Sequence, residues 1–223
     1  MTIAIPSIWL FFCVSLAVIL FTTLVMNIQE KYFFTKDVVL RKFSIKDLEF
    51  ASTSTEVANI IQGMYLLPTE RSTKAIKAFR LHMMVDFMFM IAVYMGIFLL
   101  CMKAADKMTS LLGEYFFSLL AWGQLVAWIC DLFENRYLLN QLSADAKPAT
   151  EEGHIFFQRV VAVKWILTLL GSVCALAAFF YFWVTGLYSV ESLTYLLVIF
   201  IEIIIFVMAG KMISRKLGKS ING

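Results

Sequence analysis

Hydrophobic positions gather in long stretches that are separated by polar connections. Five mostly apolar stretches reach the roughly 20 residues that a helix needs to cross a bilayer. They cover about residues 8–26, 83–102, 115–133, 160–184 and 190–209. Runs such as LLVIFI show no period of two residues, which argues against a membrane β-barrel. The pattern predicts an all-α fold, a polytopic bundle of five transmembrane helices in a single membrane domain over residues 1–223.

The polar connection between the first two stretches carries helical signals of its own. Thr53 and Glu56 fit a capping box, which predicts a short helix over about 54–62. Gly63 then offers a stop. The sequence Pro-Thr-Glu at 68–70 predicts a second helix start, and the helical pattern continues from there into the next apolar stretch. We expect a helical loop without an independent core, because about 40 residues cannot bury a sizeable core alone.

Composition supports a membrane protein. The chain is 61% hydrophobic and only 16% charged, with a mean hydropathy of +0.82. A soluble domain averages about 25% charged residues. The four cysteines lie in apolar stretches without C-x-x-C spacing, so they indicate neither a disulfide framework nor a zinc site.

The distribution of Lys and Arg predicts how the bundle sits in the membrane. Of the 19 positive side chains, nine fall in the 27–82 loop, and eight lie around the third connection and in the C-terminal tail. Only Lys103 and Lys107 occupy the second connection. Because cytoplasmic loops carry the excess of positive charge, we expect an external N-terminus and a cytoplasmic C-terminus. The positive groups would meet lipid head groups, and no basic aromatic face predicts nucleic-acid binding.

Five charged side chains lie inside or at the edges of the apolar stretches. Each costs roughly 2.5–3.5 kcal/mol in hydrocarbon unless it has a partner, water or a function. They are Asp86, Asp131, Glu134, Lys164 and Glu202. The first four fall at one height on the cytoplasmic side, whereas Glu202 is buried roughly 12 Å deep at 1.5 Å per residue.

Lys164 begins a stripe of small residues on the fourth apolar stretch. The stripe continues through Thr168, Gly171, Ala175 and Ala178. Stripes of small residues let membrane helices approach closely, so this face is expected to pack against neighbouring helices. Lys164 should then form an ion pair with Asp131 or Glu134 inside the bundle, although its long stem could also snorkel to the head groups.

Two interpretations of the polar cluster stay open. In the first, the ion pair only fixes the register of the helices. In the second, His82, Asp86, Asp131 and Glu134 converge as a ligand site that could hold a divalent cation or relay a proton. His82 and Asp86 share a helix face because they are four residues apart, and Asn135 lies beside Glu134 on the third helix.

One series of short motifs resembles a pattern in small polytopic bacterial membrane proteins of unassigned function. In chain order the motifs are Asp47-Leu48-Glu49-Phe50-Ala51, a short capped helix, Asp86, Asp131-x-x-Glu134-Asn135 and Lys164-Trp165. The resemblance covers about residues 43–184 and leaves the first and last helices outside it. It implies a multi-pass protein of a bacterial inner (plasma) membrane and adds weight to the D-x-x-E-N segment, but it implies no substrate.

Three classes of function stay open. A non-enzymatic accessory or assembly subunit of a membrane complex is favoured, because the chain contains no H-E-x-x-H, G-x-S-x-G or phosphate-binding glycine motif. One alternative is a membrane enzyme acting on a lipid or small molecule at the cytoplasmic interface. The other is a small proton-linked transporter, although five helices do not divide into equal inverted repeats. The sequence indicates no particular cofactor, and the expected partners are the lipid bilayer and other membrane-protein subunits.

Overall fold

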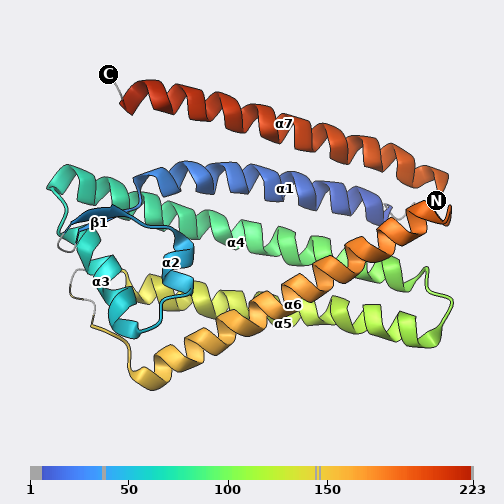
Figure 1. Cartoon of the computed structure of the whole chain (residues 1–223), viewed down its shortest axis with the longest axis horizontal. Helices are drawn as coiled ribbons and strands as arrows, with labels where there is room; N and C mark the ends of the chain where they lie inside the picture. Colours follow the sequence, from blue (N-terminus) through green and yellow to red (C-terminus); the bar gives the residue numbers. More distant parts are fainter. Residues whose placement is uncertain (1–6, 37–38, 144, 146, 222–223) are drawn as a thin grey trace, which may run out of the picture.

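Five long helices form the body of the molecule and run roughly along its longest axis (Figure 1). They are α1 (Ile8–Gln29), α4 (Thr69–Ala105), α5 (Leu111–Gln141), α6 (Glu151–Val184) and α7 (Val190–Ile221). The computed structural model describes residues 7–36, 39–143, 145 and 147–221, with side chains as far as Ile213. Within that part of the chain, these five helices are long and apolar enough to cross a membrane. The predicted helical bundle with five helices that could span a membrane is therefore confirmed, and its orientation stays a prediction.

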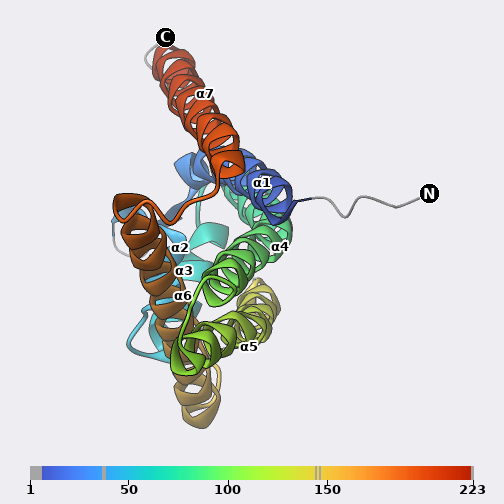
Figure 2. The same ribbon diagram turned by 90° about the vertical axis from the view of Figure 1, so that its right-hand side faces the viewer.

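The long helices pack mainly in sequence order. α1 lies against α4 and α7, α4 lies against α5, and α5 lies against α6. α6 crosses the others obliquely and also contacts α4 (Figure 1). α7 has its extensive contacts with α1 and projects away from the other helices, as the end view in Figure 2 shows.

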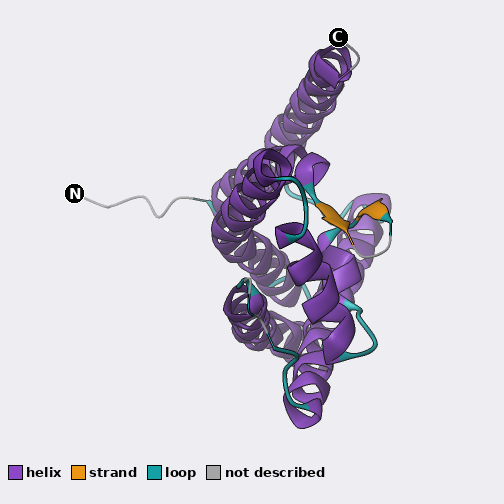
Figure 3. Ribbon diagram, turned by 90° about the vertical axis from the view of Figure 1, so that its left-hand side faces the viewer, coloured by secondary structure: helices purple, strands orange, loops and turns teal. Residues whose placement is uncertain are grey.

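A small compact unit, here called the cap, covers one end of the bundle (Figures 1 and 3). Its elements are η1 (Glu30–Tyr32), β1 (Phe34–Lys36), β2 (Leu40–Lys42), α2 (Ile45–Glu49) and α3 (Ser54–Tyr65). β1 and β2 pair antiparallel, with Phe34 opposite Lys42. The all-α prediction missed this hairpin, because strands of three residues leave almost no periodic signal in a sequence.

The cap shares its core with the bundle. Leu48 and Ile61 of the cap are fully buried and belong to one apolar cluster with Phe79 of α4, Leu138 of α5 and Phe157 of α6. Such a short segment cannot bury a sufficient core alone, so its folding depends on the ends of the long helices. The cap is in this way held against the end of the bundle that carries the charged residues.

Gly63 does not end its helix as predicted, because α3 continues to Tyr65. At the start of α3 the Thr53 hydroxyl accepts a hydrogen bond from the Glu56 N–H at 3.2 Å, as the capping pattern predicts. Gly63 instead lies where β1 crosses α3. A Cβ atom there would lie 2.9 Å from the Lys36 carbonyl oxygen and would overlap the Thr35 hydroxyl. Glycine is needed at this point for the close approach of two backbones.

We expect Gly63→Ala to destabilise the cap by about 1–3 kcal/mol, because an added methyl group overpacks the junction of β1 and α3. Thermal unfolding in detergent, with limited proteolysis of the cap, measures the effect. Gly123→Ala is the matched control, since its Cβ would lie 3.5 Å from the Leu167 side chain, an ordinary contact. Equal unfolding temperatures for the two variants would contradict the close approach.

Cysteine labelling in intact cells tests the expected orientation. Thr109 and Thr55 are both exposed, and they lie at opposite ends of the bundle. With the four native cysteines replaced, a membrane-impermeant reagent should label Thr109→Cys and leave Thr55→Cys unlabelled, because the positive charges favour a cytoplasmic cap. The reverse result would overturn the orientation.

Candidate functional site

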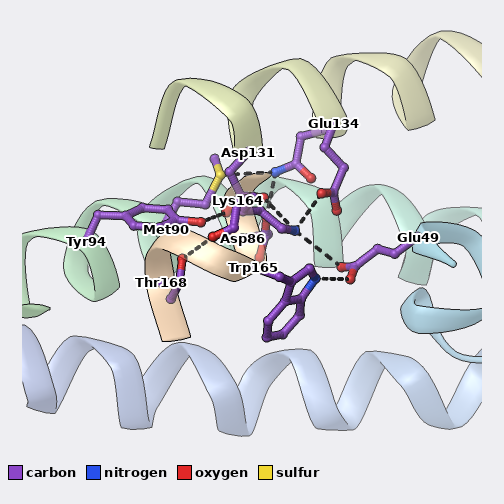
Figure 4. Close-up of polar contacts among 10 residues, drawn as sticks. Glu49, Asp86, Met90, Tyr94, Asp131, Glu134, Lys164, Trp165 and Thr168 are labelled. Atoms are coloured by element: carbon purple, nitrogen blue, oxygen red, sulfur yellow. Dashed lines mark hydrogen bonds and ion pairs between the residues drawn. The ribbon is translucent and has the colours of Figure 1, made fainter. Parts of the chain in front are cut away.

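A buried lysine forms the centre of the polar site (Figure 4). Lys164 of α6 is only 6% exposed. Its Nζ atom lies 2.5 Å from Glu134 Oε2 and 3.2 Å from Asp131 Oδ1, and both carboxylates belong to α5. A third carboxylate comes from the cap, with Glu49 Oε1 3.7 Å from the same ammonium. A charge taken out of water must be paired, and here one cation is shared among three anions.

Further donors hold these carboxylates in place. The Tyr94 hydroxyl of α4 donates to Asp131 Oδ2 at 2.8 Å, and the Trp165 indole N–H donates to Glu49 Oε2 at 3.3 Å. Both bonds satisfy the carboxylate oxygen that does not face the ammonium of Lys164. Four elements, α2, α4, α5 and α6, therefore meet in one network.

Asp86 of α4 is a fourth carboxylate at the edge of this network. The Asn135 side-chain amide donates to Asp86 Oδ2 at 2.5 Å and to the Met90 sulfur at 3.5 Å. Among the residues that the structure describes, no Lys, Arg or His forms an ion pair with Asp86. Lys164 therefore pairs with three of the four carboxylates of the cluster. The fourth, Asp86, accepts a hydrogen bond from the Asn135 amide instead.

The cluster borders a cavity of about 270 Å³. α1, α2, α4, α5 and α6 all contribute to its wall. The ionisable groups on the wall are Glu30, Lys46, Glu49, His82, Asp86, Tyr94, Asp131 and Lys164. The rest of the wall is mostly apolar, as in many small-molecule sites.

The structure brings together most of the site residues expected from the sequence. Asp131, Glu134 and Lys164 are in contact, and Asp86 and Asn135 lie beside them. His82 lines the same cavity and packs against Phe33, with ring centroids 5.3 Å apart. In the described part of the chain, no three His, Cys, Asp or Glu side chains are placed to hold a metal ion.

Glu202 lies apart from the cluster. It belongs to α7, which packs against α1 rather than against the helices that carry Lys164 and its partners. Its side chain is partly exposed, and the Oε2 atom is buried without a hydrogen-bond partner. The sequence grouped Glu202 with the other intramembrane charges, and the fold separates it from them.

Sequence reasoning assigned no role to Glu49, Tyr94 or Trp165. A signal for Glu49 existed in the cap, because α2 begins with a capping pattern in which the Asp47 carboxylate accepts from the Ser44 N–H at 2.6 Å. That pattern predicts a helix start at Ser44, but it does not predict that Glu49 of this helix lies against Lys164 of α6. Tyr94 gives no signal, since a tyrosine in an apolar stretch is also common at membrane interfaces.

The second histidine ties the cap to α6. His154 Nε2 lies 3.2 Å from the Ala51 carbonyl oxygen, and Nδ1 lies 3.4 Å from the Tyr137 hydroxyl. Among the described residues, the hydrogen bonds of His154 join it to the Ala51 carbonyl and the Tyr137 hydroxyl, and His82 Nδ1 has no partner. The site therefore combines paired charges with hydrogen-bond donors and acceptors.

Comparison of the chain with protein-family models, with curated proteins and with solved structures finds no match.

Replacing Lys164 by methionine is expected to lower the free energy of unfolding by about 3–5 kcal/mol, because the buried carboxylates lose their cation. The double variant with Glu134→Gln should recover part of this loss, since it removes the carboxylate nearest to Nζ. Thermal unfolding in detergent measures both changes.

Lys74→Met is the control for this series. Lys74 pairs with Glu70 at 2.6 Å on the exposed surface, where an ion pair contributes little. Its unfolding temperature should stay near that of the wild type. If the losses of unfolding free energy for Lys164→Met and Glu134→Gln simply add in the double variant, the two charges do not stabilise each other.

Proposed function

We propose that the chain is a non-enzymatic multi-pass membrane protein that serves as an accessory or assembly subunit of a membrane complex. The observation that carries this proposal is the mutual pairing of the cluster. Lys164 joins Glu49 of the cap to Asp131 and Glu134 of α5, and these contacts occupy the groups that catalysis would need to be free. Such a network gives a rigid junction between a cap and a helical bundle.

The surface of α7 supports an assembly role. None of the residues in its most apolar stretch is buried within the chain, and its extensive contacts are with α1. Leu197 and Phe200 are both 61% exposed. A helix attached to its own bundle by one neighbour has most of its surface free for the helix of another subunit, and packing between transmembrane helices depends on such shape matching.

The charge distribution and the resemblance support the location. An excess of Lys and Arg around the cap favours a cytoplasmic cap and an external N-terminus. The resemblance to small polytopic bacterial proteins favours a bacterial inner membrane. The core shared by cap and bundle favours one membrane domain rather than two.

The alternative of a membrane enzyme has less support. Its strongest feature is the cavity with several carboxylates, which could act as acids or bases. Three of the four carboxylates of the cluster are held by Lys164, and the hydrogen bonds of His154 join it to the Ala51 carbonyl and the Tyr137 hydroxyl.

Purification from native membranes in mild detergent tests the proposal. A membrane protein should copurify in stoichiometric amount with the wild type, and Leu197→Trp should reduce its recovery, because a bulky ring disturbs helix packing. Leu119→Trp on α5 is the matched control at another exposed leucine and should retain the partner. Absence of a stoichiometric partner, or equal recovery with both variants, would contradict an assembly interface on α7.

A further inference from the structure

The cavity beside Lys164 has an excess of negative charge. Four carboxylates on its wall, from Glu30, Glu49, Asp86 and Asp131, face two ammonium groups, from Lys46 and Lys164. Lys164 is already shared among three carboxylates, including Glu134 behind it, and Lys46 is exposed. Among the described residues, neither Glu30 nor Asp86 forms an ion pair, and Asp86 is the one of the two that lies beside the Lys164 network. A positively charged occupant would complete the pairing.

An unpaired histidine nitrogen marks the same cavity. His82 is 5% exposed and lines the cavity, and its Nδ1 atom has no hydrogen-bond partner. A buried polar atom without a partner is costly, so a ligand that donates a hydrogen bond to this nitrogen would be favoured here. His82 and Asp86 lie one helical turn apart on the same face of α4, and a single donor group between them could reach both.

The chemistry of these two groups favours an N–H donor over a metal ion. A carboxylate accepts hydrogen bonds, and a neutral imidazole accepts one through its unprotonated nitrogen. A primary ammonium group has three N–H donors and one positive charge, so it can bond to both and also neutralise Asp86. In the part of the chain that the structure describes, no three ligating side chains are placed for a metal ion.

The shape and the lining of the cavity add an apolar requirement. Its volume of about 270 Å³ exceeds what an ammonium group alone would fill, since a water molecule takes about 30 Å³ in the liquid. Met83, Phe89 and Val93 of α4 form part of the wall. An occupant that carries apolar atoms next to its charged group would fit such a wall.

The cavity lies between α1 and α6, two helices that have few contacts with each other. α1 and α6 meet where Trp9 contacts Phe179, with ring centroids 5.3 Å apart. Elsewhere α1 packs mainly on α4 and α7, and α6 packs mainly on α5 and α4. The cavity is lined by both α1 and α6, and Figure 4 shows Trp165 on the side of the cluster that faces α1. It therefore lies between two helices that are long and apolar enough to cross a membrane, and a lipid-borne occupant would enter between them.

We propose that this cavity is a binding site for an organic primary ammonium compound, with Asp86 and His82 as the direct partners of its ammonium group. The ammonium could come from the head group of an ethanolamine lipid or from a free small amine. This proposal does not depend on an assembly role for the chain, since the cavity and the surface of α7 are separate.

Ligand titration of the purified protein tests the recognition of the ammonium group. Decylammonium, below its micellar concentration, should raise the unfolding temperature and bind at least about tenfold more tightly than decyltrimethylammonium, which has the same charge but no N–H donor. Decanol supplies the control for the apolar part alone. Equal affinity for the three compounds would overturn the proposal.

Matched variants test the two partners. Asp86→Asn keeps the shape of the side chain and a carbonyl oxygen for Asn135, and it should weaken decylammonium binding about tenfold. His82→Phe keeps a ring against Phe33 and should also weaken binding. Glu114→Gln removes an exposed carboxylate at the start of α5 and should bind as the wild type does. If both Asp86→Asn and His82→Phe bind like Glu114→Gln, the site is not the one proposed.

Two further measurements distinguish the sources of the ammonium group. In the first, native mass spectrometry follows lipids bound to protein released from vesicles of equal parts phosphatidylethanolamine and phosphatidylcholine. Enrichment of the ethanolamine lipid on the wild type, lost in Asp86→Asn, supports a lipid. In the second, stabilisation by free ethanolammonium of the wild type alone supports a small amine. Failure of both measurements would overturn the proposal.

Discussion

The ammonium of Lys164 cannot stay unpaired in a low-dielectric interior, and the packing of the cap end of the bundle follows from this constraint. α6 buries the lysine on a face of small residues, where Gly171 and Ala175 let the neighbouring helices approach closely. The carboxylates that pair with Lys164 come from α5 and from α2 of the cap. One charge therefore fixes the relative positions of a helix pair and of a segment more than a hundred residues earlier in the chain.

Apolar and polar contacts act on the same junction. The shared apolar core packs the cap against α4, α5 and α6, and the size of its side chains sets the distance between the cap and these helices. The polar contacts give this apolar packing a direction, because Glu49 must face Lys164 and the Ala51 carbonyl must face His154. Hydrophobic burial alone is not directional, so the charge network determines the orientation in which the cap packs on the bundle.

Much of the fold could be predicted from the sequence, and the reasons differ between elements. The long helices follow from hydropathy and length, which act along one segment at a time. The facing of Lys164 toward α5 follows from a helical stripe and from the depth of Asp131 and Glu134, and both are local properties too. Glu49 could not be placed in this way, since a carboxylate in a polar segment costs nothing until tertiary packing buries it.

The other differences between sequence and structure also come from contacts that are distant along the chain. Gly63 has the local signature of a helix stop, whereas its actual role is set by β1, which crosses it from an earlier part of the chain. His82 and Asp86 could be assigned to one face by their spacing. The cavity that they border arises only when α1 and α2 close over that face, and no pattern within α4 contains this information.

The network also orders the events of biosynthesis. α5 is synthesised before α6, so Asp131 and Glu134 reach the bilayer before the lysine that neutralises them. An isolated α5 would hold two carboxylates at an apolar boundary at considerable cost, whereas α5 and α6 together form a neutralised pair. The two helices are therefore expected to enter the membrane as a hairpin. The cap is made earlier still, yet its attachment waits for Lys164 and His154, so this early segment of the chain is expected to be among the last parts to become fixed.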